Sequence, residues 1–178
     1  MVTSALIGPP RSEAELLQRA RAIDGLSIGE LGRRLGRPVP ADPVRGKGCA
    51  GELVERSLGA SAGTLDEPDF LELGVELKTI PLDPAGHVRE STHVCYLDLQ
   101  QVLDEEWEGS RVERKLRRVL WVPVLWAPGA PPASRRIGSA VLWSPGPRER
   151  GQLQADWIAI VGRIALGGID EISAHLGE

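Results

Sequence analysis

The most informative segment of the chain is Pro68-Asp69-Phe70-Leu71-Glu72-Leu73-Gly74-Val75-Glu76-Leu77-Lys78. From residue 75 to residue 80 the side chains follow a period of two, which predicts a β-strand. Glu76 and Lys78 then share one face of a strand that is otherwise built mostly from apolar residues. We expect Pro81 to close this strand.

Two carboxylates and one ammonium group are predicted to meet at this strand. Gly74 permits a tight turn, which could return Asp69 to the neighbourhood of Glu76 and Lys78. Hydrolysis of a phosphodiester needs such a set, because oxygen ligands must hold a hard divalent ion that activates water and neutralises charge on the phosphate. An ammonium group can position the water and stabilise the transition state. The pattern therefore allows a magnesium-dependent phosphodiesterase.

A plainer interpretation of the same residues is a solvated ion pair. Glu-x-Lys triplets are common, and an exposed same-face pair is worth less than about 1 kcal/mol. The spacing Asp69-x6-Glu76-x-Lys78 after Pro68 nevertheless resembles the Pro-Asp…(Asp/Glu)-x-Lys signature of restriction-endonuclease-like nucleases. That signature is degenerate and leaves both interpretations open.

The other elements predict a mixed α/β domain. Capping boxes at Ser12 with Glu15 and at Ser27 with Glu30 indicate two opening helices. Apolar periodicity predicts the remaining elements. They are helices over Ala50–Leu58 and Glu149–Leu166, and strands over Thr92–Leu97, Val119–Trp126 and Ile137–Trp143.

Composition is that of an ordinary globular chain. Its 178 residues are 42% hydrophobic and 26% charged, which suits one compact domain over residues 1–178. The two cysteines form no disulfide or zinc pattern, and no apolar run reaches the roughly 18 residues that a membrane helix needs. We therefore expect a cytoplasmic protein. The net charge of −4 gives no global attraction for nucleic acid, so any DNA-binding surface must be local.

Further segments resemble the MutH family, whose members are strand-nicking endonucleases of methyl-directed mismatch repair. The resemblance runs through nearly the whole chain in family order. The segments that carry it are Gly59-Ala60-Ser61-Ala62-Gly63, Asp69-Phe70, Leu73-Gly74-Val75-Glu76-Leu77-Lys78-Thr79-Ile80-Pro81, Lys115-Leu116-Arg117-Arg118-Val119-Leu120-Trp121-Val122-Pro123, Arg135-Arg136-Ile137-Gly138-Ser139 and Leu142-Trp143-Ser144-Pro145.

The resemblance implies a restriction-endonuclease-like fold, with a mixed β-sheet flanked by helices and two lobes around a DNA cleft. It implies magnesium-dependent nicking of the unmethylated strand at hemimethylated GATC sites in double-stranded DNA. It also implies activation by MutL, with MutS acting upstream. We expect a monomer that has no membrane partner.

Five residues match active-site positions of the family. Asp69, Glu76 and Lys78 match the catalytic triplet, Glu55 matches an additional acidic residue, and Lys115 matches an additional lysine. The implied metal ligands are Asp69, Glu76, Leu77 and Glu55. Without the resemblance, Glu55 would be interpreted as a solvated helix carboxylate.

The implied DNA contacts come from two segments. Lys47 and Gly48 match a family segment that approaches DNA, although a plain surface turn is an equally good interpretation of the residues themselves. Lys115, Arg117 and Arg118 belong to the strongest basic cluster, and part of that cluster is expected to reach phosphates.

The chain departs from the family at its C-terminal side. MutH proteins continue for some tens of residues beyond the point that corresponds to Glu178, and that portion reads the bases. We therefore expect weak, poorly specific DNA binding from this chain. The alternatives are a catalytically weak or inactive fragment that binds DNA or MutL, and a restriction enzyme that cuts both strands.

Overall fold

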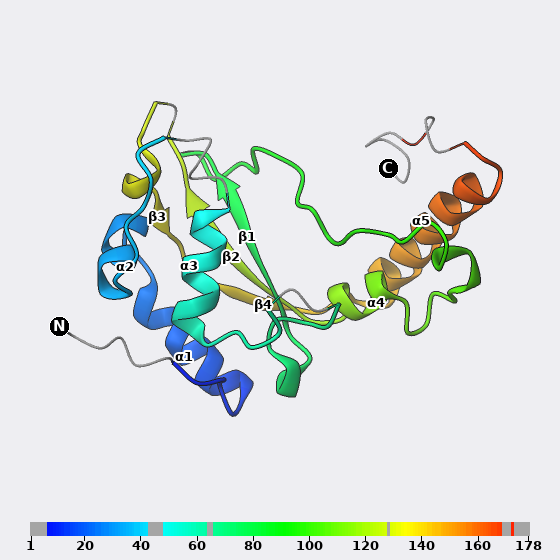
Figure 1. Ribbon diagram of the computed structural model, residues 1–178, viewed down its shortest axis with the longest axis horizontal. Coiled ribbons are helices and arrows are strands. Elements are labelled where there is room, and N and C mark those ends of the chain that lie inside the picture. Colours follow the sequence, from blue (N-terminus) through cyan, green and yellow to red (C-terminus); the bar gives the residue numbers. More distant parts are fainter. Residues whose placement is uncertain (1–6, 43–47, 64–65, 128, 169–171, 173–178) are drawn as a thin grey trace.

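The computed structural model, shown in Figure 1, describes residues 7–42, 48–63, 66–127, 129–168 and 172. Three α-helices open the described chain and a long helix follows the last strand, while short 3-10 helices (η) occur in the connections. The elements are α1 (Glu13–Ile23), α2 (Ile28–Arg34), α3 (Cys49–Leu58), η1 (Leu71–Leu73), β1 (Glu76–Leu82), η2 (Val102–Asp104), α4 (Arg111–Leu116), β2 (Val119–Leu125), η3 (Pro132–Ser134), β3 (Arg136–Ile137), β4 (Val141–Trp143) and α5 (Pro147–Ala165).

The sheet is mixed, as the sequence predicts. Strand β1 runs parallel to β2 with Glu76 opposite Val119 and Lys78 opposite Trp121. Strands β3 and β4 both pair with β2 in the antiparallel direction. The parallel pair needs a long crossover, and this crossover holds η2 and α4. The predicted mixed sheet flanked by helices is therefore confirmed.

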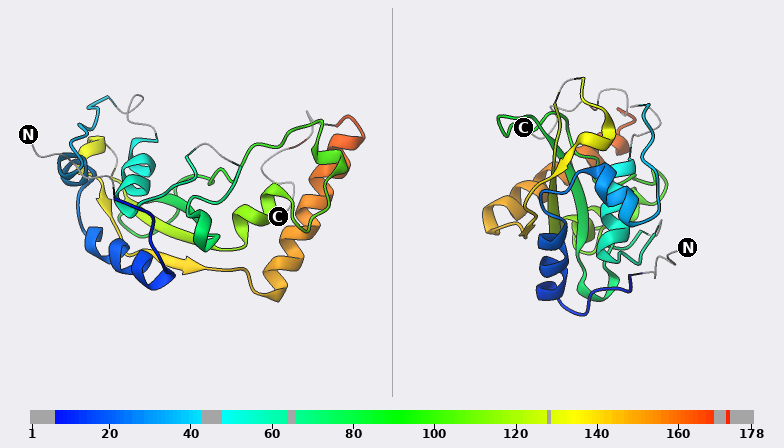
Figure 2. Two further views of the ribbon diagram at one scale, coloured as in Figure 1. Left: turned by 60° about the horizontal axis from the view of Figure 1, so that its bottom comes forward. Right: turned by 90° about the vertical axis from the view of Figure 1, so that its left-hand side faces the viewer.

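Two hydrophobic clusters divide the molecule into two lobes (Figure 1). The larger cluster joins α1, α2 and α3 to the sheet, with Leu16, Leu58 and Phe70 almost fully buried. The smaller cluster lies around α5, where the rings of Trp107 and Trp157 have centroids 6.1 Å apart. Figure 2 shows α5 at the opposite end of the molecule from α1 and α2. Trp107 therefore belongs to the core of this second lobe.

The predicted helix starts are close to the observed ones. At α2 the capping box is complete, because Ser27 accepts from the Glu30 amide and the Glu30 carboxylate accepts from the Ser27 amide. At α1 only half of the box forms. Ser12 caps the Glu15 amide, but the Glu15 carboxylate bonds Arg11 and Arg19 instead.

The prediction that Pro81 closes the first strand is wrong. Strand β1 continues to Leu82, with Pro81 opposite Val124. Within the described sheet β1 is an edge strand, so it tolerates a residue without an N–H group.

The predicted strand over Ile137–Trp143 is two strands, β3 and β4, separated by three residues. The gap lies opposite Pro123 in the middle of β2, and proline has no N–H to donate to a neighbouring strand. Gly138 donates its amide to the Pro123 carbonyl, and a Cβ at Gly138 would lie 3.1 Å from the Pro123 Cβ. Any larger residue at position 138 would have to displace Pro123 by a few tenths of an ångström.

The predicted strand over Thr92–Leu97 is also wrong, since these residues are irregular. Instead, the Val94 carbonyl of this segment accepts a hydrogen bond from the Lys78 ammonium group. On the free edge of β1, the Leu77 amide is already bonded to the side chain of Asp69. That edge therefore cannot offer this amide to a neighbouring strand.

Among the described residues, no helix has the length and hydropathy needed to cross a membrane. Cys49 and Cys95 are both free thiols, and no disulfide joins them.

Candidate active site

Glu76 is the buried centre of the candidate site. It is the first residue of β1 and only 2% of its surface is exposed. Lys78 Nζ lies 2.8 Å from Glu76 Oε1, and Lys115 Nζ lies 2.9 Å from Oε2. The prediction that Glu76 and Lys78 share a strand face is confirmed. The Glu76 carboxylate therefore contacts two ammonium groups at a position that is almost inaccessible to solvent.

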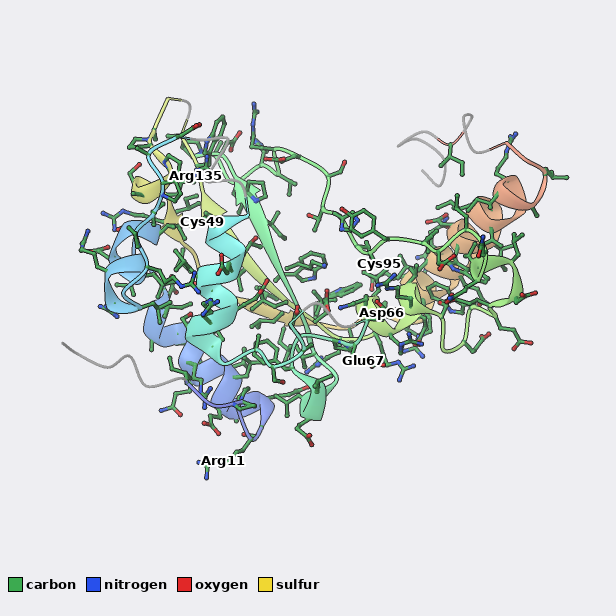
Figure 3. The ribbon with its side chains drawn as sticks, viewed as in Figure 1. Arg11, Cys49, Asp66, Glu67, Cys95 and Arg135 are labelled. Atoms are coloured by element: carbon green, nitrogen blue, oxygen red, sulfur yellow. The ribbon has the colours of Figure 1, made fainter. Side chains whose placement is uncertain are left out.

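Lys115 brings the second lobe to this carboxylate. It lies in α4, whose first turn is capped by Ser110, and it is 8% exposed. Its ammonium group also donates to the carbonyl of Glu67 at 2.6 Å. Glu67 lies between the two lobes (Figure 3). The lysine thus joins α4 to both β1 and the segment before it.

Asp69 is returned to β1 by the turn that the sequence predicts. Phe70 and Val75 exchange backbone hydrogen bonds around Gly74, which has a φ of 61° that favours glycine. The Leu77 amide then donates to Asp69 Oδ2 at 2.8 Å. Burial raises the pKa of the Asp69 carboxyl, and the charge of Glu76 raises it further, while the Leu77 amide acts in the opposite direction.

The Leu77 carbonyl belongs to the same edge of β1. The Glu76 amide donates to the Arg118 carbonyl on the side of β2, whereas the Leu77 amide points away from β2 to Asp69. The N–H and C=O groups of one strand residue point to the same side, so the Leu77 carbonyl faces the same side as Asp69. This position is compatible with its predicted role as a metal ligand.

Glu55 comes to the site from the last turns of α3. Burial raises the pKa of its carboxyl, and the charges of Asp69 and Glu76 add to the effect. Three carboxylates from α3, the loop before β1 and β1 itself therefore influence one another. A bound cation would relieve their mutual repulsion.

Two concave surfaces meet at Glu55. The larger, with a volume of about 760 Å³, is lined by Gly48, Glu55, Lys78 and Arg135, together with parts of the segment after β1. We call this larger surface the main cleft. The smaller surface, of about 290 Å³, is lined by Glu55 and Asp69 with the glycine-rich loop after α3. Glu55 therefore lies where a ligand in either hollow could reach it.

The carboxylates of this site and the Leu77 carbonyl are the kinds of ligand that a hard divalent cation prefers. The carboxylates do not converge fully, however. Among the described residues, no group of three His, Cys, Asp or Glu side chains is close enough to hold a metal ion. Both oxygens of Glu76 are bonded to lysines, so Glu76 can join a metal site only if at least one ammonium group moves.

The predicted DNA contacts are only partly assembled. Lys47 lies outside the described residues, while Gly48 is the N-cap of α3 and lines the main cleft. Arg117 pairs with Glu113 in its own helical turn. Arg118 pairs with Glu13 and also bonds Ser144. Contacts from Arg117 and Arg118 to DNA stay predictions, and each would require these guanidinium groups to change partners.

Several groups of the site have no signal in the sequence. The carbonyls of Glu67 and Val94 accept hydrogen bonds from the two lysines. Every residue type has a backbone carbonyl, so the sequence does not reveal which carbonyls act as acceptors. Arg135 lines the main cleft although it lies far along the chain from the acidic residues. It could have been suspected only from its place in the Arg135–Ser139 segment that resembles the family.

Known proteins match most of this chain. The family model described as "DNA mismatch repair enzyme MutH" matches residues 58–156. The curated protein "DNA mismatch repair protein MutH" of Shewanella amazonensis is 51% identical over 170 residues, which cover 96% of this chain and 76% of the relative. The protein of the same name from Citrobacter koseri is 49% identical over 97% of this chain and 75% of its own length.

Proposed function

This chain belongs to the MutH family of DNA mismatch repair enzymes, and on that premise we propose that it is a magnesium-dependent endonuclease that nicks DNA. Its substrate is the unmethylated strand of hemimethylated GATC sites in double-stranded DNA. MutL activates it, and MutS acts upstream of MutL. The relatives' names place those proteins in DNA mismatch repair, which supports the assignment of this pathway.

One observation carries the proposal. Asp69 is fixed to β1 through the Leu77 amide, directly beside the ion pair of Glu76 with Lys78. The exposed, solvated ion pair that the sequence also allows does not fit, because Glu76 is 2% exposed and bonds a second lysine. Burying charge is costly, and a chain keeps such a cluster where chemistry requires it.

The metal would be held by Asp69, Glu76 and the Leu77 carbonyl, with Glu55 as a further carboxylate. When bound, magnesium supplies a charge that offsets the negative charge developing on the phosphate and lowers the pKa of a water molecule. Burial and the neighbouring carboxylates raise the pKa values of Glu55 and Asp69 although lysine charges act in the opposite direction, so a bound cation would favour the charged forms of both carboxyls.

The lysines act on the phosphate and the water. Lys78 lines the main cleft, so its ammonium group can hold the attacking water and stabilise the extra negative charge of the pentavalent transition state. Lys115 is more deeply buried and holds Glu76 in place through Oε2. Lys115 would donate to the scissile phosphate once its contact with Glu76 is released.

We further propose that residues 1–178 act as a single nuclease domain, as a monomer and in the cytoplasm. The sheet that carries the acidic residues and the lobe that carries Lys115 contribute to one site, which supports a single functional unit. The two free thiols are compatible with a reducing compartment.

A plasmid assay tests the proposal. Supercoiled DNA with hemimethylated GATC sites is incubated with magnesium and the wild-type chain, with and without MutL. We expect nicked circles, stimulated by MutL, and no product with Asp69→Ala or Lys78→Ala. Linear DNA as the first product would instead favour a restriction enzyme that cuts both strands.

A second candidate is a DNA-binding or MutL-binding protein with little catalysis. The observation that favours it is the occupation of both Glu76 oxygens by lysines. In that case the wild type would bind DNA or MutL, but the plasmid would stay supercoiled at every magnesium concentration.

A further inference from the structure

Arg135 is held on a rigid piece of backbone at the rim of the main cleft. Its amide donates to the Pro132 carbonyl at 3.3 Å, and its carbonyl accepts from the Ile28 amide at 2.8 Å. The next residue, Arg136, begins β3 and pairs with Leu125 of β2. The direction in which the Arg135 side chain leaves the backbone is therefore fixed by η3, α2 and the sheet together.

Two neighbouring arginines have different surroundings at this point. Arg136 donates to the Gly25 carbonyl at 2.9 Å, so its guanidinium group is used to join β3 to the end of α1. Successive side chains of extended backbone point to opposite faces, and Arg135 lines the main cleft together with Lys78. Figure 3 shows Arg135 near Cys49, at the end of α3 where that helix begins.

The guanidinium group of Arg135 is uncompensated within the part of the chain that the structure describes. No hydrogen bond or ion pair engages it there, and its Nε is buried without a partner. Arg117 and Arg118, in contrast, are each bonded to a glutamate. The acidic side chains that line the same cleft are Glu55 and Glu90, and neither contacts Arg135. A buried donor without an acceptor costs free energy that an incoming anion would recover.

We propose that Arg135 binds a backbone phosphate of the DNA strand that lies in the main cleft, on the α3 N-terminal side of the scissile phosphate. The inference rests on the proposed nuclease function. A strand that places one phosphate at Lys78 must carry further phosphates along the same cleft, and Arg135 is a second cation lining it. A guanidinium group presents a planar fork of donors that suits two phosphate oxygens, which a single ammonium cannot match.

Salt-dependent DNA binding tests this contact. A duplex oligonucleotide with one GATC site is titrated with the wild-type chain, Arg135→Gln and Arg135→Lys, with calcium in place of magnesium and at several salt concentrations. We expect Arg135→Gln to bind roughly tenfold more weakly and to reduce the slope of log K against log salt by about 0.9, the value for one lost phosphate contact. Arg135→Lys should keep the slope but lose affinity, since it keeps the charge and loses the fork.

A matched control is Arg21→Gln, which removes the same charge from an exposed position on α1. This variant should keep the wild-type slope and affinity. A second measurement needs no altered protein: single methylphosphonates are placed along the duplex, and one neutral phosphate should weaken the wild type but not Arg135→Gln. If Arg135→Gln folds poorly, the same scan is made with Arg135→Lys, which should be less sensitive than the wild type to that one neutral phosphate because it lacks the guanidinium fork.

The outcomes separate the two proposals. If the wild type binds and nicks DNA while Arg135→Gln keeps the full salt slope, the inference about Arg135 is wrong and the nuclease function stands. If every neutral phosphate weakens both proteins equally, the inference is wrong as well. If the wild type neither binds nor nicks the duplex, both proposals are overturned.

Discussion

The ammonium group of Lys115 lies 2.9 Å from Glu76 Oε2, although the two residues are 39 positions apart in sequence. The contact joins α4 to the start of β1, and it leaves Lys78 to bond the other oxygen of the same carboxylate. The acidic centre is therefore neutralised by lysines in the metal-free chain. A divalent ion has to compete with these lysines for Glu76.

Replacing Lys115 with methionine tests this competition. The Glu76 carboxylate then keeps only the contact with Lys78, so we expect tighter binding of a divalent ion and an unfolding free energy lower by about 1–3 kcal/mol, the cost of a buried group that loses its partner. Nicking should fall by roughly 100-fold or more because a donor to the phosphate is lost. Calorimetric titration with manganese and the plasmid assay measure the two effects.

Arg114→Met is the control for Lys115→Met, since Arg114 lies one residue earlier in α4 and its side chain bonds the Gly109 carbonyl rather than Glu76. It should leave metal affinity unchanged. Weaker metal binding by Lys115→Met would show that Lys115 supports the metal site directly and does not compete for it.

Asp69→Asn should stabilise the metal-free protein while abolishing nicking. The carboxyl of Asp69 has a raised pKa because it is buried and close to Glu76, so removing its charge relieves repulsion. We expect a gain of about 1 kcal/mol, with a higher melting temperature. Magnesium should raise the melting temperature of the wild type by mass action and have little effect on the variant. Equal melting of both proteins under both conditions would argue against convergence of the carboxylates.

The difference in melting temperature between Asp69→Asn and the wild type should change with pH in one direction. A carboxyl whose pKa is raised on folding binds more protons in the folded state. Its contribution to the free energy of unfolding is therefore most favourable below its ordinary pKa of 3.8, and this contribution is lost as the pH rises through the pKa of the folded state. The melting temperature of Asp69→Asn minus that of the wild type should thus be near zero at pH 4 and increase toward neutral pH. Calorimetry in metal-free buffers measures it, and a difference that decreases with pH would contradict the assigned direction.

Two glycines of the loop after α3 give a test of the local fold. Gly59 and Gly63 both have positive φ, at 83° and 61°. A Cβ at Gly59 would collide with the Gly8 carbonyl and with the guanidinium group of Arg19, whereas a Cβ at Gly63 would meet nothing within 4 Å. Gly59→Ala should cost about 3 kcal/mol of unfolding free energy and Gly63→Ala about 1 kcal/mol. Chemical denaturation distinguishes them, and equal losses would mean that Gly8 does not pack on this helix end.

The fold can be predicted from sequence wherever local chemistry decides it. The serine caps of α1 and α2 and the alternation in β1 act within a few residues, and these elements are predicted correctly. The ends of strands depend on neighbours that the pattern does not name. The split between β3 and β4 follows from Pro123 in another strand, and the segment 92–97 stays irregular although its residues favour extended structure.

The candidate site can be predicted in part for the same reason. Glu76 and Lys78 are two residues apart on one strand, so their contact follows from strand geometry alone. Lys115 and Glu55 reach the site only through tertiary packing, and the resemblance to a family is needed to suggest them. Sequence reasoning misses Arg135 as a candidate because neither spacing nor charge pattern relates it to β1.

The most direct test of the central claim is a crystal soaked in manganese, whose anomalous signal locates the ion. We expect one site at the N-terminal end of β1, with Asp69 and Glu76 as ligands, the Leu77 carbonyl beside them, and at least one lysine moved away from Glu76. An ion bound elsewhere, or Glu76 still bonded to both Lys78 and Lys115 at saturating manganese, would contradict this expectation.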